Sequence, residues 1–137
     1  MKYLVDANVL SETTRLEPAP EVVTWLSLHE PDLVVDPIIL GELELRILRL
    51  SNGRKRASLE LWFAQTVGTM PCLPFTAQTG RTWARLLSEL RRKGFAMPIK
   101  DSLIAATARE HGLTVVTHNT RAFRRAGVKL LDPFGLH

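Results

Sequence analysis

Short apolar runs alternate with longer amphipathic segments along this chain. The runs consist mostly of Val, Leu and Ile, which is typical of buried strands. The longer segments have apolar positions three or four residues apart, which is typical of helices. Strands are predicted at residues 2–5, 33–35, 70–75, 113–117 and 128–131. Helices are predicted at residues 21–30, 37–49, 54–67, 76–93, 101–111 and 119–125.

This alternation of strands and helices predicts an α/β fold. A strand, a helical crossover and a second strand usually form a right-handed unit with the two strands parallel. Parallel sheets are normally covered on both faces, which agrees with the apolar runs on the strands. We therefore expect a central parallel sheet of about four or five short strands with helices on both faces.

The composition predicts a single domain over residues 1–137, with 45% hydrophobic and 23% charged residues, and excludes a disordered chain. The single cysteine, Cys72, allows no internal disulfide and fits a reducing cytoplasm. No apolar run approaches membrane-spanning length, and Asp6 comes too early for a secretory signal peptide, so we expect a cytoplasmic protein without membrane contact. The net charge of +4 and the pI near 9.7 favour a polyanionic partner.

Polar side chains occur at the positions where several predicted strands are followed by helices. Asp6 directly follows the first strand, Thr117 ends the strand at residues 113–117, and Asn119 lies two residues further along. Asp101 opens an alanine-rich helix after a proline-marked segment. Since the carboxyl ends of parallel strands share one edge, where α/β sheets bind ligands, we expect these side chains to converge. The alternative is purely structural, because Asp and Asn are also common helix caps and Thr117 suits a turn.

Glu42 is a further acid of interest, inside the apolar helix at residues 37–49. On a helical wheel it lies at the margin of the buried arc, so it can lean into the same crevice. The alternative is an exposed ion pair with Arg46, one turn further along the helix. Gly41 disfavours a helix interior and would suit the close approach of another backbone segment.

Three carboxylates in one crevice repel one another, and a divalent cation removes this repulsion. The ligand set Asp6, Glu42 and Asp101 offers only oxygen atoms, which favours Mg²⁺, or alternatively Mn²⁺, over zinc. The four histidines have no metal-ligand spacing. We therefore expect one or two hard divalent ions in this crevice.

The ordered set of these motifs resembles the PIN domain, most of all the VapC ribonuclease toxins of bacterial toxin–antitoxin pairs, the FitB-like branch included. The resemblance covers residues 2–133. It rests on Leu-Val-Asp-Ala-Asn-Val-Leu-Ser-Glu around Asp6, on Glu42, on Asp101 before its alanine-rich helix, and on Val-Val-Thr-His-Asn-Thr-Arg-Ala-Phe around Asn119.

Three residues depart from the pattern of the family. Ala7 stands where a small hydroxyl residue is common, Asn119 where many members carry a fourth acid, and Ala122 where an acid is frequent. An asparagine can still offer its carbonyl oxygen to a metal or a water molecule. The missing charge puts a tightly held second metal ion in doubt.

The resemblance implies a PIN-like fold and a Mg²⁺-dependent endoribonuclease that leaves a 5′-phosphate. The catalytic residues it implies are Asp6, Glu42, Asp101 and Asn119, of which Asp6, Asp101 and Glu42 would bind metal. Asn8 and Thr117 are expected to orient the carboxylates. Candidates for contact with the RNA backbone are Arg54, Lys55, Arg56, Arg121 and Arg124. The implied partners are an RNA substrate, a cognate antitoxin protein that silences the toxin, a second copy in a homodimer, and a larger toxin–antitoxin assembly.

Two other functions stay open at this point. A haloacid-dehalogenase-like phosphatase also begins with an aspartate at the end of its first strand, but it needs a second acid where Asn8 stands and normally a cap domain. A catalytically weak PIN-like module that binds RNA or a protein is the other alternative, and Asn119 is the residue that favours it.

Overall fold

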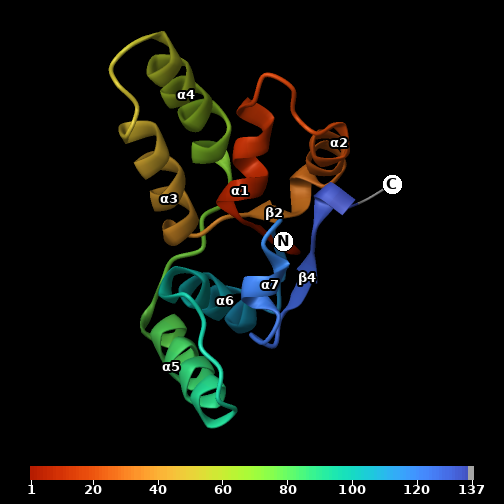
Figure 1. Cartoon of the computed structure of the whole chain (residues 1–137), viewed down its shortest axis with the longest axis vertical. Helices are drawn as coiled ribbons and strands as arrows, with labels where there is room; N and C mark the ends of the chain where they lie inside the picture. Colours follow the sequence, from red (N-terminus) through yellow and green to blue (C-terminus); the bar gives the residue numbers. More distant parts are fainter. Residues whose placement is uncertain (136–137) are drawn as a thin grey trace.

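The structure, a computed structural model, describes residues 1–135 and contains one four-stranded sheet (Figure 1). The strands are β1 (Tyr3–Val5), β2 (Leu33–Val34), β3 (Thr114–Val116) and β4 (Lys129–Leu131). Their order in the sheet is β2-β1-β3-β4, and every neighbouring pair is parallel. The expectation of a short-stranded parallel sheet is confirmed.

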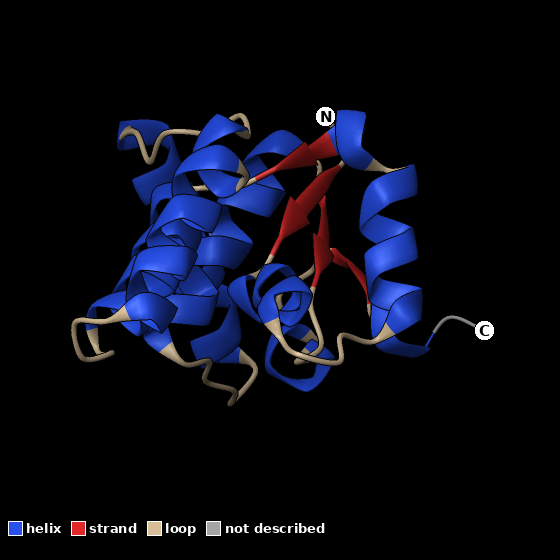
Figure 2. Cartoon of the chain, turned by 90° about the horizontal axis from the view of Figure 1, so that it is seen from above, coloured by secondary structure: helices blue, strands red, loops and turns tan. Residues whose placement is uncertain are grey.

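Helices lie on both sides of this sheet, as Figure 2 shows. They are α1 (Ala7–Leu10), α2 (Pro20–Leu28), α3 (Pro37–Leu48), α4 (Arg54–Gln65), α5 (Ala77–Arg92), α6 (Ile99–His111) and α7 (Thr120–Phe123). Short 3₁₀ turns occur at η1 (Ser11–Thr14), η2 (Glu30–Asp32), η3 (Val67–Thr69) and η4 (Pro133–Gly135). Within residues 1–135, none of the helices is long and apolar enough to cross a membrane.

The strand predicted at residues 70–75 is reduced to a single bridge between Cys72 and Val35. The amide of Val35 donates to the carbonyl of Pro71 at 3.0 Å, and the amide of Leu73 donates to the carbonyl of Val35 at 2.9 Å. Pro71 and Pro74 have no N–H group, so pairing does not continue along this segment.

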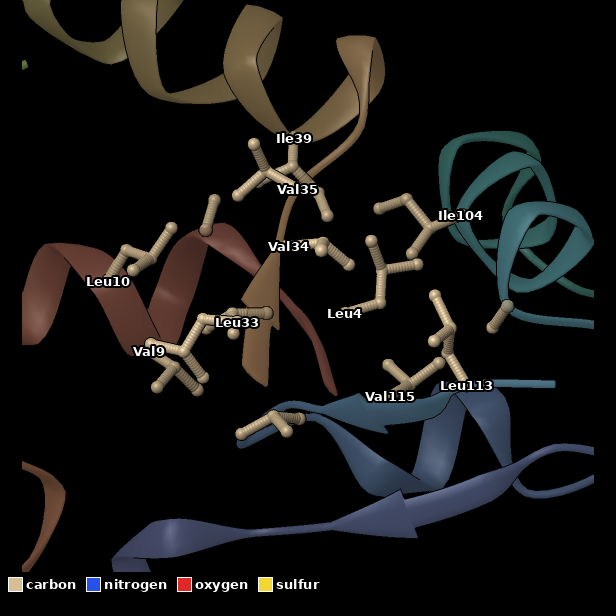
Figure 3. Close-up of a cluster of buried hydrophobic side chains, with 14 of the residues drawn as sticks. Leu4, Val9, Leu10, Leu33, Val34, Val35, Ile39, Ile104, Leu113 and Val115 are labelled. Carbon is tan, nitrogen blue, oxygen red and sulfur yellow. The ribbon is translucent and has the colours of Figure 1, made fainter. Parts of the chain in front are cut away.

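The core lies between the central strands and the helices that carry the candidate acids (Figure 3). Leu4, Val34 and Val115 from the sheet are buried together with Ile39 of α3 and Ile104 of α6. Burying each such side chain contributes about 1.5–3 kcal/mol. This packing fixes α3 and α6 against the sheet, and with them Glu42 and Asp101.

Local signals set where these two helices begin and end. The Asp36 carboxylate accepts a 2.9 Å hydrogen bond from the amide of Ile39, and Pro37 occupies the first turn, so α3 begins as the sequence predicted. Helix α6 ends at Gly112, whose φ of 64° is the left-handed conformation that favours glycine. The chain then enters β3 at the centre of the sheet.

Candidate active site

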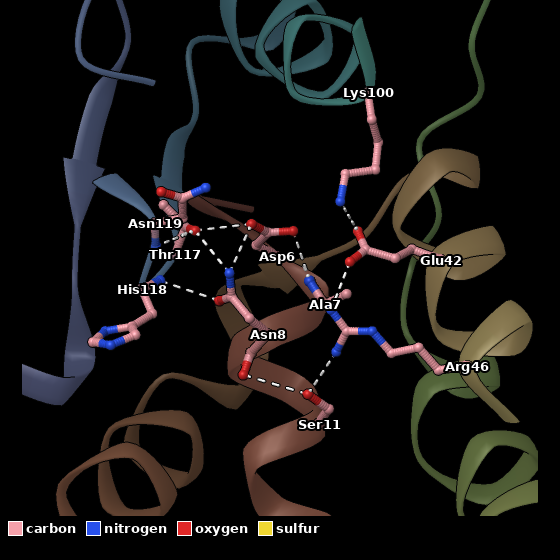
Figure 4. Close-up of polar contacts among 10 residues, drawn as sticks. All are labelled: Asp6, Ala7, Asn8, Ser11, Glu42, Arg46, Lys100, Thr117, His118 and Asn119. Carbon is pink, nitrogen blue, oxygen red and sulfur yellow. Dashed lines mark hydrogen bonds and ion pairs between the residues drawn. The ribbon is translucent and has the colours of Figure 1, made fainter. Parts of the chain in front are cut away.

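Asp6 leaves β1 at the carboxyl edge of the sheet and is almost completely buried, with 4% exposure. Its Oδ1 accepts a 2.8 Å hydrogen bond from the amide of Ala7, which caps α1. Its Oδ2 accepts a 2.8 Å hydrogen bond from the hydroxyl of Thr117, at the end of β3 (Figure 4). The capping role and the convergence of the two strand ends are therefore both present.

Asn8 joins the two strand ends through its side-chain amide. Its Nδ2 lies 3.3 Å from Oδ2 of Asp6 and 3.2 Å from Oγ1 of Thr117 and donates to both. Its Oδ1 accepts a 3.1 Å hydrogen bond from the amide of His118. The amide thus joins the Asp6 carboxylate to the loop after β3.

Asp101 is the third residue of α6 and is also buried, with 6% exposure. It is not the helix cap, because Pro98 occupies that position and makes no side-chain capping bond. The neighbouring turn is held by Ser102, whose hydroxyl donates to the carbonyl of Ile99 at 2.6 Å and accepts from the indole nitrogen of Trp83 at 2.9 Å. Asp101 is therefore an acid in the first turn of α6, where a negative charge is favourable, but it makes no capping bond there.

Glu42 reaches the site from α3 and meets two cationic side chains (Figure 4). Its Oε2 accepts a 2.7 Å hydrogen bond from Nη2 of Arg46, so the ion pair considered from the sequence is present. Nζ of Lys100 lies 2.9 Å from Oε1 but out of hydrogen-bonding alignment, which leaves this buried oxygen with a charge contact only. The expected close approach of a backbone to Gly41 is wrong, because a Cβ there would meet nothing within 4 Å.

The charges of the candidate acids affect the pKa values of Asp6 and Asp101. Burial raises the pKa of Asp6, the hydrogen bonds from Thr117 and Ala7 oppose this, and the charge on Glu42 raises it further. Burial likewise raises the pKa of Asp101, the charge of Lys100 lowers it, and the charges of Asp6 and Glu42 raise it. The charges of Glu42 and Asp6 therefore make ionisation of the neighbouring aspartates less favourable, as expected for carboxylates that repel one another.

Asn119 lies beside this group but faces solvent. Its backbone amide donates a 3.0 Å hydrogen bond to Oγ1 of Thr117, and it precedes α7 without a side-chain capping bond. The hydroxyl of Thr117 is therefore a junction between Asp6, Asn8 and the backbone of Asn119.

The predicted RNA-binding residues differ in how they are held. Arg54 and Lys55 are exposed at the start of α4, and Arg121 and Arg124 are exposed in and just after α7. Arg56 instead donates to Glu60 at 2.7 Å and lies against the end of α3.

Sequence reasoning missed Lys100 and the hydroxyl of Ser11, which accepts a 3.1 Å hydrogen bond from Nη1 of Arg46. The signal for Lys100 was its position next to Asp101. The signal for Ser11 was its place one turn after Asn8, at the end of α1.

The side chains within residues 1–135 form no ready-made group of three or more His, Cys, Asp and Glu that could hold a metal ion. Glu42 is turned towards Arg46 and Lys100, and both oxygens of Asp6 are hydrogen-bonded. The chemistry of the donor set nevertheless fits a hard divalent cation, since the charges of Asp6 and Glu42 raise the pKa of Asp101 and Oε1 of Glu42 is buried without a hydrogen bond.

The sequence profile of the PIN domain matches residues 3–129. The chain is 35% identical to Toxin FitB of Neisseria gonorrhoeae over 96% of this chain and 97% of that protein. It is 31% identical to Ribonuclease VapC1 of Rickettsia felis, over 91% of this chain and 90% of that protein. A crystal structure of FitAcB from Neisseria gonorrhoeae superposes with a TM-score of 0.90 at 35% identity, covering 98% of this chain and 99% of that one.

Proposed function

The chain belongs to the PIN domain family, and we propose that it is the toxin of a toxin–antitoxin pair, a Mg²⁺-dependent endoribonuclease. The observation that carries this proposal is the joint position of Asp6, Glu42 and Asp101. Three elements distant in sequence bring these buried or half-buried carboxylates close enough that the charge of Glu42 raises the pKa of both Asp6 and Asp101.

The reaction is hydrolysis of a phosphodiester bond. A bond forms between the oxygen of a water molecule and phosphorus, the bond from phosphorus to the 3′ oxygen breaks, and that oxygen takes up a proton. The products are a 5′-phosphate and a 3′-hydroxyl. When bound, a divalent cation would supply a Lewis acid that neutralises phosphate charge and lowers the pKa of water.

The residues of this chain have separate roles in that reaction. Asp6 and Asp101 would hold the cation, with Glu42 beside them. Thr117 and Asn8 hold the Asp6 carboxylate in place through hydrogen bonds to Oδ2, which would orient it for binding the cation. Asn119 would offer a neutral oxygen at the rim.

An antitoxin protein is the partner that we propose for the toxin, together with a second copy in a homodimer. The relative FitB is named a toxin, and its crystal structure is of FitAcB. An antitoxin segment that covers the acid cluster would block RNA, which is how we expect silencing to occur.

The first experiment compares the wild type with Asp101→Asn and Asp6→Asn in a bacterial host that expresses no antitoxin. We expect the wild type to arrest growth and to produce discrete 5′-phosphorylated cuts in sequenced small RNA. The two variants should do neither while melting at nearly the wild-type temperature. Asp32→Asn is the matched control, because it makes the same change at a carboxylate that pairs with the N-terminus.

Cleavage by the purified protein should also vanish on addition of EDTA and return with excess Mg²⁺. Cleavage that persists in Asp101→Asn would contradict the proposed role of this acid. A folded wild type that binds RNA without cutting it would favour the binding module, for which the exposed and uncharged Asn119 is the supporting observation.

A further inference from the structure

Lys100 places a positive charge inside the acid cluster, where the sequence alone suggested only carboxylates. It extends from the second position of α6, and its Nζ lies 2.9 Å from Oε1 of Glu42 on α3 (Figure 4). The Glu42 side chain is only 15% exposed, whereas that of Lys100 is 49% exposed. The ammonium group therefore reaches from the open rim of the site to a buried oxygen.

The charge of Lys100 acts on the whole cluster and not on Glu42 alone. It opposes the rise in pKa at both Asp6 and Asp101. Arg46 holds the other oxygen of Glu42 from the same helix, and it is itself anchored to Ser11. Lys100 is thus a cation that contacts Glu42 directly and whose charge also acts on the other two acids.

The balance of charge limits how many cations this site accepts. When the three carboxylates are ionised, Arg46 and Lys100 together leave them with a single net negative charge. One divalent ion reverses that sign, and a second would enter a site that is already positive. Asn119 adds no charge at the position where a fourth acid would support a second ion.

We propose that Lys100 is a fixed counter-charge that takes the place of a second divalent cation. The site then binds one ion, at Asp6 and Asp101, and the ammonium beside Glu42 supplies the other positive charge. Ammonium and guanidinium groups share with Mg²⁺ the capacity to stabilise the negative charge that develops in phosphoryl transfer. This inference rests on the proposed nuclease function and specifies how its site is charged.

The test is a calorimetric titration of the full chain with Mn²⁺ in the absence of RNA. The variants are Lys100→Met, which keeps the length of the side chain without its charge, and Lys100→Arg, which keeps the charge. Lys129→Met is the matched control, because this exposed lysine on β4 changes the net charge equally. Thermal melting of each variant establishes that it is folded.

We expect the wild type, Lys100→Arg and Lys129→Met to bind one Mn²⁺ per chain, and Lys100→Met to bind a second. A wild type that binds two ions or none would overturn the inference, and so would a Lys100→Met variant with unchanged stoichiometry. Since no RNA is present, the titration is independent of cleavage. A chain that lacks ribonuclease activity but shows this change in stoichiometry would contradict the proposed function. It would still support the inference that Lys100 takes the place of a second cation.

Discussion

The hydroxyl of Thr117 donates a 2.8 Å hydrogen bond to Oδ2 of Asp6 across 111 positions of sequence. The two residues directly follow the paired central strands β1 and β3, so the bond is a direct result of parallel topology. It is completely buried, and it opposes the effect of burial on the pKa of Asp6. Thr117 therefore favours the ionised form that a metal ligand needs.

Replacing this hydroxyl by a methyl group should weaken catalysis more than folding. We expect Thr117→Val to lower cleavage about 10–100-fold, the usual effect of removing a group that orients a metal ligand. Its stability should fall by only about 1 kcal/mol. The measurement is the rate at saturating Mg²⁺, with the melting temperature alongside. Thr114→Val is the control, since it makes the same substitution at the other end of β3. Equal rates in both variants would rule out an orienting role.

Asn119→Asp should restore a fourth negative charge at the rim of the site. The backbone of Asn119 is joined to Thr117, which in turn contacts Asp6, so a carboxylate there would act on the bound cation. We expect the Mg²⁺ concentration for half-maximal cleavage to fall about tenfold, because added negative charge strengthens cation binding. Asn52→Asp, in the exposed loop before α4, is the control and should leave the Mg²⁺ dependence unchanged. The same Mg²⁺ dependence in both variants would contradict the prediction.

The buried carboxyl group of Asp36, which is not one of the proposed catalytic residues, leads us to expect a pH dependence of folding. It is fully buried, its Oδ1 caps α3, and its Oδ2 has no hydrogen-bond partner within residues 1–135. Burial raises its pKa above the ordinary value of 3.8. The folded state therefore retains the proton to higher pH than the unfolded chain. The resulting stability is fully present below pH 3.8 and is lost as the pH rises through the folded pKa.

Urea unfolding of Asp36→Asn at several pH values measures this effect. Asparagine keeps the cap without the ionisation, so the wild type should lose stability relative to this variant as the pH rises above 3.8. Asp36→Ala removes the cap and should be less stable than Asp36→Asn by about 1 kcal/mol at these pH values. A difference between wild type and Asp36→Asn that does not vary with pH would exclude a buried ionisation at this position.

The sheet and the proximity of Asp6 to Thr117 could be predicted from the sequence, because both follow from the parallel topology of the strands. Apolar runs locate the strands, and parallel connection brings their carboxyl ends to one edge. Residues 70–75 do not form the predicted strand, because two prolines in this segment lack the N–H groups that pairing requires. These prolines are visible in the sequence, but they do not indicate how many residues of the segment still pair.

The contact between Lys100 and Glu42 could not be predicted in the same way. It depends on how α3 and α6 pack across the edge of the sheet, which large buried side chains such as Ile39 and Ile104 determine jointly. It also depends on the conformation of a long, half-exposed side chain, which no periodic pattern specifies. Gly41 illustrates the same limit, since its presence in a helix suggested a neighbour that the packing does not supply.

Arg121 and Arg124 are the predicted RNA contacts whose exposure agrees best with that role, since both extend into solvent close behind Asn119. The double variant Arg121→Ala/Arg124→Ala should bind RNA about tenfold more weakly at moderate salt. It should also reduce the slope of log affinity against log salt, because fewer counterions are released. The control is Arg91→Ala/Arg92→Ala, which removes the same charge at the end of α5. The affinity is best measured by fluorescence anisotropy with the cleavage-deficient Asp101→Asn background. If both double variants reduce the slope equally, attraction to the RNA comes from the overall charge of the protein. The RNA backbone would then have no specific contact with Arg121 and Arg124.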